Sequence, residues 1–272
     1  MKKIILYTLL SVLLLIMGYF GAKAYEQAIL YEEVTTELVT YQGPEAQAIQ
    51  QLEKLAKSIL GDLYNDEMKM NLDLIKEKQV LVMQKAKINT LYFMLVLGLL
   101  LLGYFVVSLR AFTLFGSMAA MMTLFIGLMA PILMVTIHKE VEYLGDIVLS
   151  FESKGIMGSI EKLFESGDFV VAAVILLFSV ITPILKILSL LFISLFMESK
   201  FAHNIVKFFK AIGKWSMVDV FVVAVFLVYL TSNKGDISRA EVEVGLYFFL
   251  SYVIVSMLVS LSADKMLHSL KS

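Results

Sequence analysis

The sequence contains no cysteine, which excludes disulfide bonds, thiolate zinc sites and cysteine nucleophiles. Its three histidines, His138, His203 and His268, are not paired at the spacing of metal ligands. Charged residues make up only 17% of the chain and the net charge is -1, so there is no overall basic field to attract nucleic acid. These absences predict a protein that is not an enzyme, uses no metal or cofactor and does not bind nucleic acid.

Apolar residues are what the sequence has in excess: 59% of its 272 residues are hydrophobic, and the mean hydropathy is +0.83. A membrane-spanning helix needs about 20 mostly apolar residues, because the hydrocarbon core is about 30 Å thick. The runs lack the two-residue alternation of membrane β-strands. The sequence therefore predicts an all-α integral membrane protein with about six transmembrane helices. The six runs are Ile4–Ala22, Thr90–Leu109, Phe112–Ile137, Phe169–Phe196, Trp215–Leu230 and Val244–Leu261.

Basic residues predict how these spans are oriented, because Lys and Arg in short loops tend to stay in the cytoplasm. The loop over residues 138–168 holds seven acidic residues against three lysines, as expected of an external loop. Both termini are then cytoplasmic, including a tail over residues 266–272, and residues 25–89 are periplasmic. The basic residues on the cytoplasmic side are Lys2, Lys3, Arg110, Lys200, Lys207, Lys210, Lys214, Lys265 and Lys271.

The N-terminus has two interpretations. Two lysines, an apolar run and Ala22-Lys23-Ala24 are typical of a signal peptide with its cleavage site. Ile4–Ala22 is longer than most signal-peptide apolar regions and long enough to span the bilayer, which favours a retained anchor over residues 1–24. The rest of the topology is the same in both cases.

Residues 25–89 differ from the spans, because they are rich in Glu, Lys and Gln. Both ends must return to the membrane, so we expect an extramembrane helical hairpin that turns near residues 61–66. The hairpin is either a spacer or oligomerisation stalk, or a module that docks a partner. Two helices have too little core to be stable alone, so they should pack on other chains or copies. Amphipathic three-and-four spacing is clearest at Ala48, Leu52, Leu55, Ile59 and Leu63.

The fourth span contains Lys186, about 15 Å from its cytoplasmic end by helical rise, too deep for the side chain to reach water easily. An ionisable group at this depth costs about 2.5–3.5 kcal/mol on insertion scales, so a functional role is the default. Pro183 removes a backbone hydrogen bond beside it and predicts a helix bend, as does Pro131 in the third span. At about 100° per residue, the polar side chains form one stripe: Ser179, Thr182, Lys186 and Ser189.

Asp219 on the next span is the expected counter-charge of Lys186, and Ser216 shares its helix face. One interpretation is a structural Lys–Asp pair that holds two helices together. The other, which we favour, is a proton-responsive pair in a site of low dielectric. Ser256 on the last span extends this polar network if its hydroxyl faces the pair; many such hydroxyls bond their own backbone.

The string Ile212-Gly213-Lys214-Trp215-Ser216-Met217-Val218-Asp219-Val220-Phe221-Val222-Val223 resembles the signature of the paraquat-inducible protein A (PqiA/LetA) family. Thr182-Pro183-Ile184-Leu185-Lys186 is similar to that family's proline-x-leucine-lysine span. Weaker matches are Ala130-Pro131-Ile132-Leu133 and Leu163-Phe164-Glu165-Ser166-Gly167, and the resemblance covers about residues 111–265.

The resemblance implies a bacterial inner-membrane protein that works with MCE-domain proteins, which move lipids across the envelope. Lys186, Ser216 and Asp219 match polar intramembrane positions of the family, and Ser179 and Ser256 match less closely. Longer members have two four-helix domains and zinc ribbons, whereas this chain has one such domain over residues 110–265. The anchor, the hairpin and the second span over residues 90–109 have no counterpart, and self-association is an open alternative. The partners implied are an MCE-domain protein and phospholipid; the alternative function is a membrane sensor or scaffold.

Overall fold

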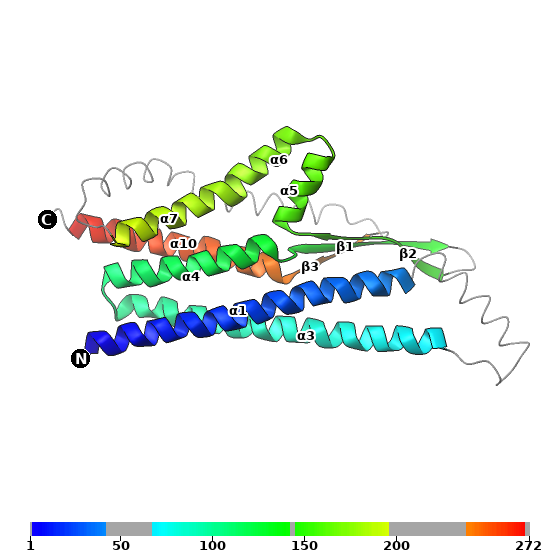
Figure 1. The fold of residues 1–272 in the computed structure, drawn as a ribbon, viewed down its shortest axis with the longest axis horizontal. Helices are drawn as coiled ribbons and strands as arrows, with labels where there is room; N and C mark the ends of the chain where they lie inside the picture. Colours follow the sequence, from blue (N-terminus) through cyan, green and yellow to red (C-terminus); the bar gives the residue numbers. More distant parts are fainter. Residues whose placement is uncertain (1, 42–66, 142–144, 196–237, 270–272) are drawn as a thin grey trace, which may run out of the picture.

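The computed structural model describes residues 2–41, 67–141, 145–195 and 238–269, which are mostly helical (Figure 1). Within these ranges, five helices are long and apolar enough to cross a membrane. The predicted class, a helical integral membrane protein, is confirmed, while the predicted span Trp215–Leu230 lies outside the described residues. The five spans lie within Ile4–Tyr41, Met70–Phe105, Leu109–Met129, Phe169–Leu195 and Val244–Met266.

The two longest helices, α1 (Lys2–Tyr41) and α3 (Glu67–Leu102), form an antiparallel pair. The Phe20 and Tyr92 ring centroids lie 5.2 Å apart, and about four helical turns further out Gln79 Nε2 donates to Thr35 Oγ1 at 2.9 Å. α1 is unbroken through Ala22–Ala24. The boundaries predicted at residues 24/25 and 89/90 therefore fall inside continuous helices, and the predicted turn near residues 61–66 lies outside the described residues.

Helix α4 (Leu109–Met129) packs closely on α10 (Val244–Ser269). It follows the short 3₁₀ helix η2 (Gly103–Phe105), so the second span ends before Leu109 and that residue belongs to the third. Small residues on α4 allow the close approach, as is common between membrane helices. A Cβ at Gly127 would lie 2.7 Å from the backbone N of Phe249.

The third span is shorter than predicted, because α4 ends at Met129 and β1 (Leu133–Val141) begins four residues later. Pro131 was predicted to bend this helix, but it lies beyond the helix end. The residue before a proline is restricted to extended conformations, and Ala130 has φ -76° and ψ 151°. The β-branched residues at 135–137 then favour a strand. The sequence did not show this change, because a short apolar run is compatible with either a strand or a helix.

The structure contains a three-stranded antiparallel sheet that the sequence pattern did not predict. Its order is β2-β1-β3, formed by β1, β2 (Gly145–Lys154) and β3 (Ser238–Val242). It packs beside the outer part of α1 and α3 (Figure 1). Tyr31 of α1 and Val82 of α3 form a buried cluster with Met134 of β1, and Phe151 of β2 packs against it. The expectation that these helices need another chain for a core is thus wrong on this face, because the same chain supplies the cover.

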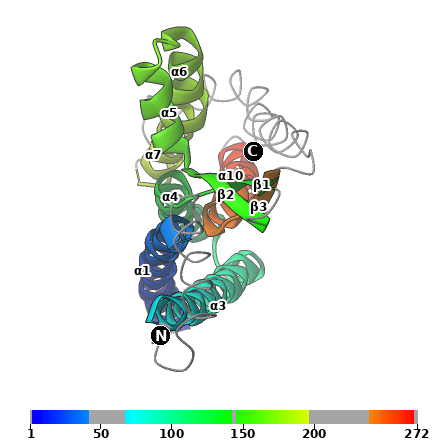
Figure 2. The same cartoon turned by 90° about the vertical axis from the view of Figure 1, so that its right-hand side faces the viewer.

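The fourth predicted span is one helical rod of three pieces: α6 (Phe169–Ile175), the π-helix η3 (Leu176–Ile181) and α7 (Thr182–Leu195). Helix α5 (Ile156–Glu165) runs across the direction of the spans at its outer end (Figure 1). In Figure 2, α5, α6 and α7 lie on one side of α4, and α1 and α3 lie on the other. Both termini lie at the opposite end from the sheet (Figure 1).

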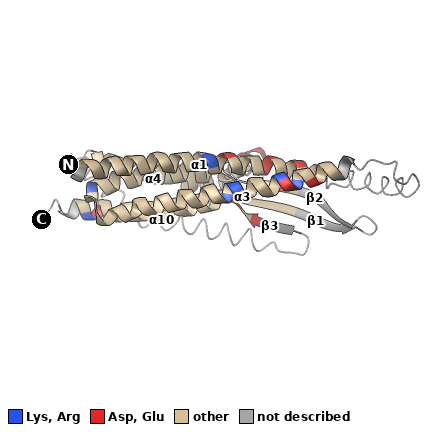
Figure 3. Cartoon of the chain, turned by 90° about the horizontal axis from the view of Figure 1, so that it is seen from below, with Lys and Arg blue, Asp and Glu red and all other residues tan. Residues whose placement is uncertain are grey.

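Charged residues divide α1 and α3 into zones along this axis (Figure 3). On both helices they occupy the outer half, and an uncharged stretch follows toward the end at which the termini lie. On α1 this stretch runs from Ile4 to Ala22, which at about 1.5 Å per residue matches a hydrocarbon core.

Candidate intramembrane site

Lys186 of α7 contacts α10 inside the spans: its Nζ donates to Ser256 Oγ at 3.2 Å. Ser256 is fully buried, and its hydroxyl in turn donates to the carbonyl oxygen of Val253 at 3.0 Å. A hydroxyl has one hydrogen and two lone pairs, so this arrangement directs a lone pair at the ammonium group. The contact joins two spans that are 70 residues apart in sequence.

The helix that carries Lys186 changes its winding just before it. Thr182 Oγ1 donates to the carbonyl oxygen of Leu177 at 2.8 Å, five residues back, at the end of the π-helix. Pro183, which has no N–H, follows as the second residue of α7. Single π-turns within α-helices occur frequently at functional sites.

The predicted polar stripe lies at the edge of the buried face of this rod. Ser179 is buried, whereas Thr182, Lys186 and Ser189 are half-buried. Ser189 Oγ donates to the carbonyl oxygen of Leu185 at 2.7 Å, within its own helix. The structure thus brings Lys186 to Ser256, while Thr182 and Ser189 bond their own helix. Gly213, Lys214, Trp215, Ser216 and Asp219 lie outside the described residues.

Helix α10 is held in place by α4, and this fixes Ser256. Thr113 Oγ1 contacts Ser262 Oγ at 3.2 Å, one and a half turns beyond Ser256. A Cβ at Gly116 would lie 2.6 Å from a methyl carbon of Val259. Close packing of this kind leaves little room for α10 to move relative to α4.

The end of α7 is tied to the start of α4 near the termini. Arg110 Nε donates to the carbonyl oxygen of Ser194 at 2.9 Å, and its Nη2 donates to that of Leu195 at 3.1 Å. In the opposite direction, Ser194 Oγ donates a hydrogen bond to the carbonyl oxygen of Arg110 at 3.1 Å. Nearby, Lys265 Nζ donates to Tyr104 Oη at 2.8 Å. Positive side chains at helix C-termini are favourable, because they lie near the negative end of the helix dipole. Basic residues and tyrosine are also typical of the membrane–water interface, so these contacts are consistent with a membrane boundary here.

Glu243 is a buried acidic residue that the sequence analysis did not single out. It directly precedes α10, is 5% exposed, and its Oε1 has no hydrogen-bond partner. Burial raises the pKa of its carboxyl to about 7; Glu241 adds to this shift and Lys87 opposes it. The sequence did carry a signal for Glu243: this acidic residue stands between Val242 and Val244, at the start of the last apolar run.

The backbone holds Glu243 at a crossing of chain segments. Its N–H donates to the carbonyl oxygen of Ile132 at 2.9 Å, and that of Gly245 donates to Pro131 at 2.8 Å. A Cβ at Gly245 would lie 2.5 Å from the carbonyl oxygen of Ala130. Pro131 therefore belongs to a tight junction between sheet and spans. Among the described residues, no group of three or more His, Asp or Glu could hold a metal ion.

Residues 113–268, more than half of the chain, match the family model described as "Paraquat-inducible protein A". The chain belongs to this family. Lys186, Asp219, Ser256 and Glu243 fall in the matched region, whereas α1 and α3 precede it. The family assignment made from the Trp215–Asp219 string is therefore confirmed.

Two curated relatives show how far the similarity extends. One, named "Intermembrane transport protein PqiA", from Escherichia coli K12, is 28% identical over 125 residues, which are 44% of this chain and 30% of that protein. A "Probable intermembrane transport protein" from Haemophilus influenzae is 28% identical over 118 residues, 41% of this chain and 28% of that protein. The chain thus covers less than a third of these relatives. No solved structure matches the chain.

Proposed function

We propose that this protein is the inner-membrane component of an MCE-type lipid transport system and handles phospholipid between the inner membrane and the envelope. Membership of the paraquat-inducible protein A family supports this proposal, as do the relatives named intermembrane transport proteins. The partner, an MCE-domain protein, is the one that the family resemblance implies. Both termini are proposed to be cytoplasmic, with the sheet and the outer parts of α1 and α3 in the periplasm.

The observation that carries the mechanism is the hydrogen bond between Lys186 and Ser256. An ion at this depth costs free energy, and such residues in membrane proteins commonly mark transport pathways or proton relays. We assign Asp219 as the counter-charge and Ser216 as its neighbour. Protonation of the Asp219 carboxylate would weaken its attraction for the Lys186 ammonium. Helix α7 would then be freer to shift against α10 at the π-turn beside Pro183.

Lipid analysis of the purified protein tests this proposal. The chain is isolated from its host's membranes, and bound phospholipid and co-purifying proteins are quantified by mass spectrometry at several pH values. We expect an MCE-domain protein and phospholipid to co-purify, with a pH dependence of bound lipid that is lost in Lys186→Ala and Asp219→Ala. Lys265→Ala is the matched control, because Lys265 lies near the end of a span and contacts Tyr104.

Two results would overturn parts of the proposal separately. Wild-type lipid binding and pH dependence in both Lys186→Ala and Asp219→Ala would exclude the coupling mechanism while leaving lipid handling intact. Absence of both phospholipid and an MCE-domain protein from the wild-type preparation would reject the transport role.

A sensor or scaffold is the second candidate function. The outer part of α3 supports it, because apolar side chains there, including Leu74 and Leu81, are exposed. Deleting the outer helices would not test it, since Tyr31 and Val82 cover Met134 of the sheet. Substituting Leu74 and Leu81 by Ser leaves that cluster intact. If the protein is a scaffold, this variant should no longer co-purify with a partner protein other than a second copy of this chain, while still binding phospholipid.

A further inference from the structure

An apolar stripe runs along the face of α3 that points away from α1. It recurs at every seventh residue, and each member is between 49% and 59% exposed. The members are Leu74, Leu81, Ile88, Leu95 and Leu102. Helices that wind around each other carry apolar residues at two positions of a seven-residue repeat, and this stripe supplies one of the two.

No part of the described chain covers this stripe. The opposite face of α3 packs on α1 through Ile75 and Val82, which are buried, and through Gln79, which donates to Thr35. At about 100° per residue, Leu74 and Leu81 point well away from that face.

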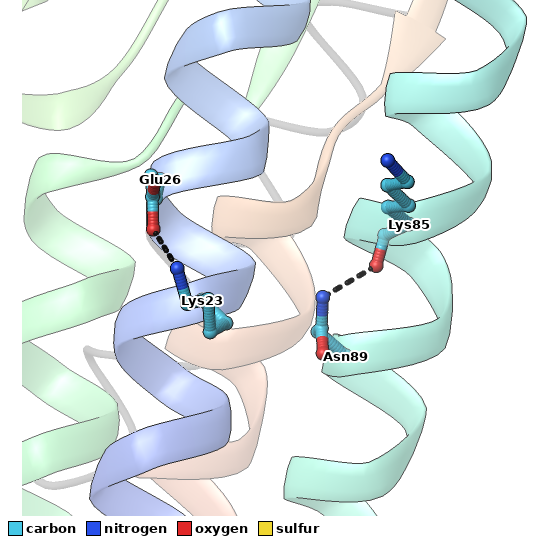
Figure 4. Close-up of polar contacts among 4 residues, drawn as sticks. All are labelled: Lys23, Glu26, Lys85 and Asn89. Atoms are coloured by element: carbon cyan, nitrogen blue, oxygen red, sulfur yellow. Dashed lines mark hydrogen bonds and ion pairs between the residues drawn. The ribbon is translucent and has the colours of Figure 1, made fainter.

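Lipid cannot cover the outer part of the stripe. Polar and charged side chains mark the membrane boundary on both helices: Lys23 and Glu26 form an ion pair of 2.7 Å on α1, beside Lys85 and Asn89 on α3 (Figure 4). Leu81 lies about 12 Å beyond Asn89 by helical rise, and Leu74 lies about 22 Å beyond it. A row of exposed apolar side chains in water marks an interaction surface.

The residues beside the stripe favour a second copy as its partner. Two copies in one membrane have the same topology, so their α3 helices run parallel. Asp73 and Lys78 flank the stripe on opposite sides, five residues apart, which is the spacing that pairs residues between parallel helices in a coiled coil. A two-fold axis would place Asp73 of each copy beside Lys78 of the other, so the pair forms twice.

The other positions of the repeat are compatible with close approach. Met70 and Leu91 are apolar, and Gly98 has no neighbouring atom within 4 Å of a Cβ. Gln84 can bond its equivalent in the second copy, as polar core residues do when they fix register. Glu77 is the one charged residue at these positions; it would face its equivalent in the second copy, with Lys78 of each copy beside the pair. We propose that α3 is a parallel homodimerisation helix that joins two copies of this chain along residues 70–95.

Cysteine cross-linking tests the proposal cleanly, because the chain has no native cysteine. Leu74→Cys and Leu81→Cys are oxidised in intact membranes and compared with Lys76→Cys, an exposed residue on another face of the same helix. We expect disulfide-linked dimers at the two stripe positions and few at Lys76. Equal cross-linking at all three positions would show random collision and overturn the proposal.

A charge reversal gives an independent test of the parallel pairing. Asp73→Lys should weaken dimerisation, measured by single-molecule photobleaching, and Asp73→Lys with Lys78→Asp should restore it. Two exposed ion pairs correspond to roughly a 2- to 30-fold change in the dimer dissociation constant. Lack of rescue, or a wild-type protein that bleaches in single steps, would reject the parallel dimer. A disulfide from Leu81→Cys to a cysteine placed within residues 45–63 of the same chain would instead assign the stripe to that segment.

Discussion

At the scale of single residues, Lys186 and Glu243 are two ionisable groups whose removal from water costs free energy. Lys186 was identifiable from the sequence, because ionisable residues within membrane spans are rare and usually functional. Glu243 was missed because an acidic residue beside a span normally lies in water. Its burial depends on Ile132 and Pro131, which are more than 100 residues away in sequence. Only the tertiary fold supplies that contact.

The bond between Lys186 and Ser256 predicts the effect of removing the hydroxyl. Ser256→Ala takes an acceptor from the ammonium group of the half-buried Lys186, and we expect a loss of about 1–3 kcal/mol in stability. Thermal unfolding of the detergent-solubilised protein measures this loss. Ser189→Ala is the matched control, because Ser189 donates to Leu185 of its own helix. Equal melting temperatures for the two variants would show that the contact adds nothing.

The buried carboxyl of Glu243 predicts a dependence of stability on pH. Its pKa is about 7 in the folded protein against an ordinary value of 4.5. The folded state therefore holds the proton more tightly, and the stabilisation is complete below about pH 4.5 and lost as pH rises through 7. The full effect is about 3 kcal/mol, because each unit of pKa difference between the folded and unfolded states corresponds to about 1.4 kcal/mol.

Glu243→Gln keeps the shape of the side chain and cannot ionise. We expect it to melt at a higher temperature than the wild type at pH 8, with a smaller difference at pH 5. Glu33→Gln, the same substitution at an exposed position on α1, is the matched control. A wild-type profile that is flat between pH 5 and 8 would contradict the burial of Glu243.

At the scale of elements, hydropathy located the spans well where they begin and end in charged or capped sequence. The start of the last span at Val244 and the start of the fourth at Phe169 agree with the structure. It failed after Met129, where apolar residues continue into β1. The pairing of β1 with β3 joins residues about 100 positions apart, so no local pattern reports this part of the sheet.

The contact of α4 with α10 predicts that Gly127 cannot be replaced. Gly127→Val would place side-chain atoms against the backbone of Phe249, and we expect destabilisation of roughly 3 kcal/mol or more. Folded yield and melting temperature report the effect. Gly158→Ala on α5 is the control, because a Cβ there meets no atom within 4 Å. A folded Gly127→Val with wild-type stability would mean that the two helices are further apart.

At the scale of the whole molecule, the sequence predicted that residues 25–89 form a module outside the membrane, but it did not predict how this module packs on the rest of the chain. The predicted hairpin of residues 25–89 is continuous with the spans and shares a core with the sheet through Tyr31, Val82 and Met134. Movement of the sheet would therefore be transmitted to α1, and through the junction at Glu243 to α10. The family-matched region and the added helices form one packed body.

The proposed orientation predicts which residues are accessible from outside. Glu37→Cys on outer α1 should react with a membrane-impermeant maleimide in cells whose outer membrane alone is permeabilised. Val106→Cys, exposed in the turn between α3 and α4, should react only after the inner membrane is opened. The opposite pattern would invert the topology.

We propose that Lys186 belongs to the working site of a phospholipid transporter. The rate at which pulse-labelled phospholipid reaches the outer membrane, in host cells that depend on this protein, tests this role. We expect cells with Lys186→Ala to transfer lipid as slowly as cells without the protein, whereas cells with Lys265→Ala match the wild type. Wild-type transfer in cells that express folded Lys186→Ala would contradict it.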